Sequence, residues 1–140
     1  MVTRAVRNHN PLNIEYRPQN QWAGLVDHRT DTRFCEFNSD FFGFRAGFII
    51  LRKYLAQKPL GYGCRNIAQV ISMWAPPSEN NTSHYIDFVA NRAGISKTHP
   101  ITFDDRDTLI SIVQAMAQME SGKVYSTYVI SLAYDAVTKR

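Results

Sequence analysis

The stretch "TFDDRDTLISIVQAMAQMESG", residues 102–122, has the pattern of a long amphipathic helix and decides the fold class. The apolar residues that recur at positions i, i+3, i+4 and i+7 are Leu109, Ile112, Val113 and Met116. This spacing puts them on one face of a helix, where they can enter a core. Aspartates in the first turn and Gly122 after the last turn are helix start and stop signals.

Outward from this helix, the chain predicts a mainly α (α+β) domain with one small β-hairpin. We expect further helices over residues 38–57, 66–74, 79–94 and 126–137, from apolar periodicity and from capping residues at their ends. The hairpin would pair "WAGLV" (22–26) with "RFCEF" (33–37) across the turn "DHRTDT". Residues 1–20, rich in Asn and Pro, predict loop and short turns. A chain of 140 residues fits a single domain over 1–140.

The charge of the chain is unevenly distributed. Residues 1–65 carry ten Lys/Arg and five Asp/Glu, whereas residues 66–140 carry six and seven. A basic half suits a polyanionic partner or is simply a solvated face. The chain has no nucleic-acid motif, so nucleic acid is not an expected partner.

Location and cofactors are predicted from what the pattern lacks. No apolar run is long enough for a membrane span, and the first ten residues lack the apolar centre of a secretory signal. We therefore expect synthesis in the cytoplasm and action in the periplasm or cell wall, or as a component of a virion. Cys35 and Cys64 have no metal-ligand spacing, so we expect two free thiols and neither a metal nor another cofactor. A catalytic Cys35 with His28 or His84 is a less supported alternative.

Glu120 interrupts the apolar face of the 102–122 helix. It stands four residues after Met116, where the stripe would place another buried side chain. Burial and the negative end of the helix dipole would both raise the pKa of this carboxyl. A carboxyl that keeps its proton near neutral pH can act as a general acid. Alternatively, the helix ends early and Glu120 turns into water.

The segment "AMAQMESG" (115–122) resembles the end of the catalytic helix in the lysozyme-like superfamily, which includes lytic transglycosylases and flagellar-type N-acetylglucosaminidases. In these enzymes the catalytic glutamate lies in a similar "ESG" or "ES". The resemblance implies that Glu120 is the general acid of a peptidoglycan glycan-strand-cleaving enzyme. The cleaved substrate would be the peptidoglycan strand.

The order of other segments is also similar to these glucosaminidases over residues 7–55. An Asn-rich segment "NHNPLNIEY" (8–16) precedes "WAGL" (22–25), "RFCEF" and the helix "FGFRAGFIILRKYL" (42–55). In the family the Glu-bearing helix comes before the Asn-rich segment, whereas here it comes near the end of the chain. A circular permutation would reconcile the two orders if the termini lie close together.

The whole chain further resembles small bacteriophage virion or lysis proteins that share "RNNNPxNIxY", "WxG" and "WAPPSENxT". This resemblance makes other virion proteins possible partners. It also supports an alternative function, a non-enzymatic virion structural or cell-wall-binding protein.

The resemblances imply a set of substrate-binding residues beside the catalytic Glu120. These are Asn8, Asn10, Asn13, Glu15, Trp22, Asn81 and Tyr85. The asparagines would donate to N-acetyl groups, and the aromatic rings would stack on sugars. For each of them, turn, cap or core chemistry is the alternative. Candidates for a second carboxylate are Glu15, Asp27, Asp31 and Glu36, and none of them stands out.

Overall fold

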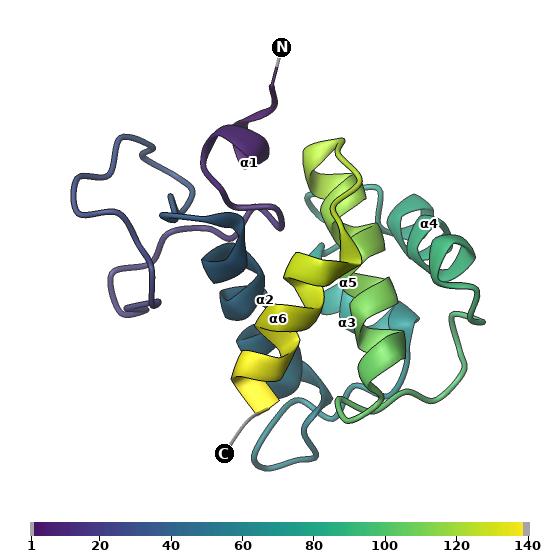
Figure 1. Cartoon of the computed structure of the whole chain (residues 1–140). Helices are drawn as coiled ribbons and strands as arrows, with labels where there is room; N and C mark the ends of the chain where they lie inside the picture. The colour runs from purple at the N-terminus through teal and green to yellow at the C-terminus, as the bar shows by residue number, and fades with distance from the viewer. Residues whose placement is uncertain (1, 139–140) are drawn as a thin grey trace.

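The computed structural model describes residues 2–138, and its regular structure is helical (Figure 1). The described residues form six helices, which confirms the mainly α class. The helices are α1 (Arg4–Arg7), α2 (Asp40–Leu55), α3 (Ile67–Trp74), α4 (Thr82–Ala93), α5 (Arg106–Ser121) and α6 (Thr127–Thr138). The expectation of loop alone at the start of the chain missed α1, whose first turn is capped by the side chain of Thr3.

The helix that decided the fold class, α5, packs against both α4 and α6 (Figure 1). On the other side of α6 lies α2, and α3 contacts α2 and α4. All four residues of the predicted apolar stripe on α5 are at most 1% exposed. Burial of this stripe stabilises the packing of α5, because apolar area removed from water contributes about 25 cal/mol per Å².

The helix ends form where cap chemistry predicts them. The side chains of Asn66 and Asn81 accept backbone N–H groups in the first turns of α3 and α4. Gly94 and Gly122 end α4 and α5 with φ of +69° and +78°. Such left-handed C-caps favour glycine, because a Cβ is strained there.

The expected β-hairpin is wrong, since residues 2–138 contain only isolated bridges and no strand. One antiparallel bridge joins Leu25 to Phe37, within the two stretches that were expected to pair, and another joins Glu15 to Phe34. The ladder stops because the loop between the stretches satisfies its own backbone. The side chain of Asp31, rather than an opposite strand, accepts the N–H groups of Arg33 and Phe34.

The Asn-rich segment is ordered and packs against α2. Two glycines one turn apart on α2 make room for it: a Cβ on Gly43 would lie 2.7 Å from the carbonyl oxygen of His9, and one on Gly47 would lie 2.2 Å from Leu12 Cδ1. Leu12 is fully buried in the core that α2, α5 and α6 share.

The start of the described chain lies at the end of α5. The Thr3 hydroxyl donates to the Ser121 carbonyl at 2.7 Å. The C-terminal end of α6 lies at the opposite end of the molecule from α1 (Figure 1). The described ends of the chain are therefore not the close pair that the permutation argument expected.

Candidate functional site

Glu120 lies in the last turn of α5 and remains largely buried, so the helix does not end early enough to release it into water. Three side chains donate hydrogen bonds to its carboxyl group. Tyr85 Oη and Trp74 Nε1 donate to Oε2 at 2.9 and 3.3 Å, and Asn13 Nδ2 donates to Oε1 at 3.3 Å. The donors come from α4, α3 and the Asn-rich segment, so separate parts of the chain converge on one carboxyl.

Two opposing effects set the pKa of Glu120. Burial disfavours the charged form and raises the pKa, whereas the bonds from Tyr85, Asn13 and Trp74 favour the charged form and lower it. Burial prevails, and the pKa lies above its ordinary value of 4.5. Burial also raises the pKa of the Tyr85 hydroxyl well above 10, so this group remains a donor at neutral pH.

Asn13 is held in an unusual conformation beside Glu120. Its φ of +53° lies in the left-handed region, which asparagine tolerates better than most residues. Its Nδ2 also donates to the Glu120 backbone carbonyl at 3.2 Å. Its Oδ1 is buried and accepts no hydrogen bond within the described residues. The Asn13 amide therefore bonds Glu120 through its nitrogen, while its oxygen has no donor in the described part of the chain.

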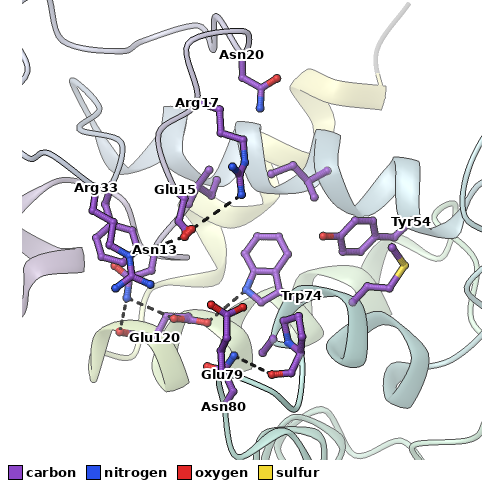
Figure 2. A pocket seen from close by; sticks show the side chains of 16 residues that line it. Asn13, Glu15, Arg17, Asn20, Arg33, Tyr54, Trp74, Glu79, Asn80 and Glu120 are labelled. Carbon is purple, nitrogen blue, oxygen red and sulfur yellow. Dashed lines mark hydrogen bonds and ion pairs between the residues drawn. The ribbon is translucent and has the colours of Figure 1, made fainter.

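Glu120 opens onto a cleft with a volume of about 400 Å³ (Figure 2). Glu15 and Asn13 line the same cleft, so three predicted site residues meet there. The other polar and aromatic residues of the lining are Arg17, Asn20, Arg33, Phe34, Tyr54, Trp74, Glu79 and Asn80. A cleft of this size with aromatic and polar walls is of the kind that binds small organic groups.

Glu15 faces two arginines in the cleft (Figure 2). Its carboxylate oxygens lie 3.8 Å from Arg33 Nε and 4.0 Å from a terminal nitrogen of Arg17. Both distances exceed those of a direct hydrogen bond. Glu15 therefore balances part of the positive charge of the two arginines without a direct hydrogen bond to either guanidinium.

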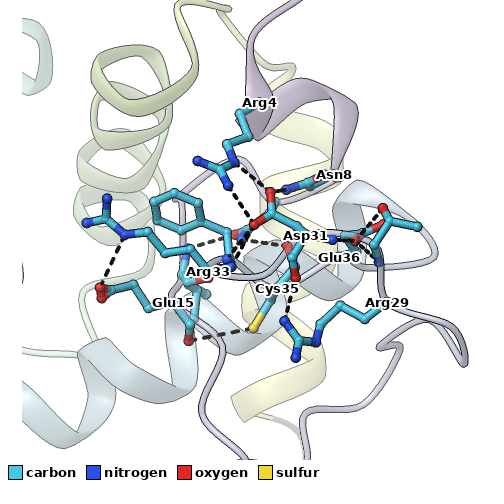
Figure 3. Close-up of polar contacts among 12 residues, drawn as sticks. Arg4, Asn8, Glu15, Arg29, Asp31, Arg33, Cys35 and Glu36 are labelled. Carbon is cyan, nitrogen blue, oxygen red and sulfur yellow. Dashed lines mark hydrogen bonds and ion pairs between the residues drawn. The ribbon is translucent and has the colours of Figure 1, made fainter.

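Asn8 and Asn10 stabilise the fold and do not line the cleft. Asn10 is fully buried, and its amide bonds the Ile14 N–H, the Ile14 carbonyl and the Cys35 carbonyl, each at 3.0 Å. Asn8 Nδ2 donates to Asp31 at 3.0 Å (Figure 3). These asparagines have the turn and packing role that was the alternative for them.

Asp31 is the centre of a second polar cluster (Figure 3). Arg4 donates to both of its oxygens, at 2.6 and 2.9 Å. This guanidinium holds the pKa of Asp31 well below its usual range, and further bonds from Phe34, Asn8 and Arg33 act in the same direction. Glu36 accepts the Thr30 hydroxyl at 2.8 Å in the same loop. Both carboxylates, which were candidate partners for Glu120, thus hold the loop together.

The remaining predicted binding residues also lie outside the cleft lining. Trp22 packs against the core, with an indole N–H that has no partner among the described residues. Asn81 is the exposed N-cap of α4, while the preceding Glu79 and Asn80 line the cleft. Tyr85 lies behind Glu120 and contacts its carboxyl without lining the opening.

The thiols do not fit a nucleophilic role. Cys35 is fully buried, and burial raises its pKa to about 11. Nucleophilic cysteines need a lowered pKa. Burial also raises the pKa of Cys64. Across residues 2–138, no group of three His, Cys, Asp or Glu side chains is arranged to hold a metal ion.

Sequence reasoning missed several cleft residues, chiefly Trp74 as a donor to Glu120 and the pair Arg17 and Arg33. Each of these residues has an ordinary local pattern, and only the tertiary fold brings them together. The basic excess of the first half of the chain was the one signal that pointed toward the arginines.

Comparisons with known proteins give a phage relative. The chain is 39% identical over 129 residues to "Protein P5" of Pseudoalteromonas phage PM2, a match that covers 91% of this chain and 76% of the relative. No family model matches the chain. No helix among the described residues is both long and apolar enough to cross a membrane.

Proposed function

This chain belongs to the family of protein P5 of Pseudoalteromonas phage PM2, and we propose that it cleaves the glycan strands of peptidoglycan with Glu120 as general acid. The observation that carries the proposal is the environment of Glu120. It is a carboxyl of raised pKa at the edge of a cleft, and it is oriented by three side-chain donors.

These features suit proton transfer to a glycosidic oxygen. Burial raises the pKa of Glu120 and so favours its protonated form, which is the form that can donate to a substrate. When the proton leaves, negative charge develops on the carboxylate, and Tyr85, Trp74 and Asn13 already point their donors at it. Such bonds strengthen as charge appears, so they favour the transition state, in which the sugar acquires oxocarbenium character.

The second group of the reaction stays open between two routes. Glu15 and Glu79 are the other carboxylates that line the cleft. A hydrolase would use one of them, whereas a lytic transglycosylase would rely on the acetamido group and hydroxyl of the substrate. Identification of the product, reducing or anhydro, separates these routes.

The proposal includes a single lysozyme-like domain with a permuted order of segments. Its support is local: Thr3 contacts Ser121, and Asn13 contacts Glu120. The Asn-rich segment thus starts where the Glu-bearing helix ends, as it does along the chain of the resembling enzymes. Because α1 and the end of α6 lie far apart, linking these two ends directly would not restore the segment order of the resembling enzymes (Figure 1).

A zymogram on purified murein tests the proposal with wild type, Glu120→Gln and a control, Asp107→Asn. Asp107 belongs to the same helix and its side chain is 96% exposed. Glutamine preserves the shape of Glu120 and can still accept from Tyr85 and Trp74. Clearing by the wild type and the control but not by Glu120→Gln is the expected result.

Equal clearing by all three proteins would remove Glu120 from the mechanism. If the wild type clears nothing but sediments with murein sacculi, the protein is a wall-binding component of the virion instead. If it neither clears nor sediments, it packs among other virion proteins or binds nucleic acid. Titration with DNA at two salt concentrations separates these, since binding to DNA falls steeply with salt.

A further inference from the structure

One end of the cleft carries two guanidinium groups with a single carboxylate between them. The side chains of Arg17 and Arg33 are 59% and 61% exposed, and both line the cleft that Glu120 opens onto. Their ion pairs with Glu15, at 4.0 and 3.8 Å, are too long for hydrogen bonds. One positive charge at this end of the cleft is therefore not balanced by Glu15.

Two other arginines of the chain bind carboxylates in bidentate contacts. Arg4 bonds both oxygens of Asp31, and Arg106 bonds both oxygens of Asp135 at 2.9 and 3.0 Å. A guanidinium presents a planar fork that matches a carboxylate in this way. The forks of the cleft arginines make no such closed contact with a protein carboxylate within the described residues.

The position of Arg33 is fixed by its neighbours. Its guanidinium lies over the Phe34 ring, 4.8 Å from the ring centre, and Phe34 also lines the cleft. The backbone N–H groups of both residues donate to Asp31 at 2.9 Å. The buried Asp31 cluster thus holds the arginine at the rim, which lowers the entropy lost on binding an anion.

Arg17 approaches the same space from the Asn-rich segment. Its side chain points into the cleft beside Glu15 and toward Trp74 (Figure 2). A turn follows it, in which the Asn20 N–H donates to the Arg17 carbonyl at 2.9 Å. The two arginines belong to different segments and meet at one carboxylate.

We infer that Arg17 and Arg33 form a carboxylate-binding subsite that selects anionic sugar chains over neutral ones. This inference rests on the proposed function and names its substrate class. A neutral chain of N-acetylglucosamine has no carboxylate, whereas a peptidoglycan strand has them on its peptide stems or, once the stems are removed, on its lactyl groups. In the empty cleft, Glu15 competes with the substrate carboxylate for both arginines.

Binding is measured in a Glu120→Gln background, so that no ligand is consumed, by calorimetry with three soluble ligands. These are glycan fragments with peptide stems, the same fragments stripped by an amidase, and neutral chitohexaose. Because a hydrogen-bonded charge pair forms only with the anionic fragments, they should bind at least about tenfold more tightly than chitohexaose. Whichever anionic fragment binds more tightly identifies the stem or the lactyl carboxylate as the source.

The affinity for the anionic fragment divided by the affinity for chitohexaose is called here the affinity ratio. Two opposite changes of this ratio are expected. The double variant Arg17→Gln/Arg33→Gln should bring the ratio close to one, and Glu15→Gln should raise it because the competing carboxylate is gone. The control Arg7→Gln, which removes an exposed arginine outside the cleft, should leave the ratio unchanged. Thermal unfolding of each variant checks the fold, which substitutions of mostly exposed side chains should preserve.

A ratio near one in the background protein, or a ratio that the double variant leaves unchanged, would overturn the subsite. Failure of the proposed function can be distinguished from failure of the subsite. A protein that clears no murein yet shows the arginine-dependent ratio retains the subsite as part of a wall-binding surface. A protein that clears murein with an arginine-independent ratio loses only the subsite.

Discussion

Removal of the Tyr85 hydroxyl is the most direct perturbation of the electrostatics at Glu120. Tyr85 is 5% exposed, and its bond to Glu120, at 2.9 Å, is the shortest of the three side-chain bonds to the carboxyl. Tyr85→Phe deletes this donor and retains the ring. A hydrogen bond to a charged group contributes about 1.5–3 kcal/mol, against about 0.5–1.5 kcal/mol between neutral groups. The ionised form of Glu120 therefore loses more than the protonated form, and the pKa of Glu120 should rise further.

The same imbalance changes stability with pH. In the wild type the folded protein holds a proton on Glu120 that the unfolded chain releases, so stability declines as the pH rises above 4.5. Tyr85→Phe should make this decline steeper. We expect a deficit relative to the wild type of about 1 kcal/mol at pH 4, where Glu120 is protonated, and about 2 kcal/mol at pH 7.5.

Two assays check this prediction. Carbon-13 NMR of the Glu120 carboxyl follows its titration, and urea unfolding at both pH values gives the free energies. Tyr54→Phe is the matched control, since Tyr54 lines the cleft but makes no hydrogen bond to Glu120 within residues 2–138. A pKa of Glu120 that stays constant or falls in Tyr85→Phe would refute the reasoning.

Two further substitutions test the polar groups that hold the loops. Asn10→Ala should lower the free energy of unfolding by about 3–5 kcal/mol, because two carbonyls and one N–H lose their buried partner; urea unfolding measures it, and a loss no larger than that of the exposed control Asn80→Ala would contradict it. Asp31→Asn should cost about 3 kcal/mol at neutral pH. Because the folded pKa of Asp31 is lowered, its contribution is present above pH 3.8 and lost as the pH falls below it. The variant should therefore lose less stability in acid than the wild type, and parallel acid transitions of the two proteins would count against this role.

Local signals were sufficient to predict the long helices and insufficient for the loops. The apolar period of α5 and the glycine after it act within a few residues, so the sequence reveals them. The hairpin prediction was wrong because it took aspartate as a turn former, whereas Asp31 replaces strand pairing with side-chain bonds. The four-residue α1 is too short to show a period.

The candidate site was predictable only at the residue that breaks a pattern. Glu120 was identified because a carboxyl continues an apolar face. The three asparagines of this segment have the same side-chain chemistry, yet only Asn13 bonds Glu120. Asn8 bonds Asp31, and Asn10 bonds the Ile14 carbonyl. Their different directions follow from backbone dihedrals and from packing on α2, which no local pattern encodes.

The glycines of α2 connect the fold to the site. In a helix interior, glycine is about 1 kcal/mol less favourable than alanine, so two of them one turn apart oppose helix formation. They are tolerated because the Asn-rich segment occupies the space where their side chains would be, with backbone and Pro11 at Gly43 and with the Leu12 side chain at Gly47. A methyl group on Gly43 would displace His9 and Pro11, and with them the turn in which the Asn13 N–H donates to the Asn10 carbonyl. The hydrogen bond from Asn13 to Glu120 therefore depends on α2, although none of the three side chains that donate to the Glu120 carboxyl belongs to that helix. Substitution of Gly43 on α2 should then change the pKa of the Glu120 carboxyl by moving a hydrogen-bond donor, while Glu120 keeps its place in the last turn of α5.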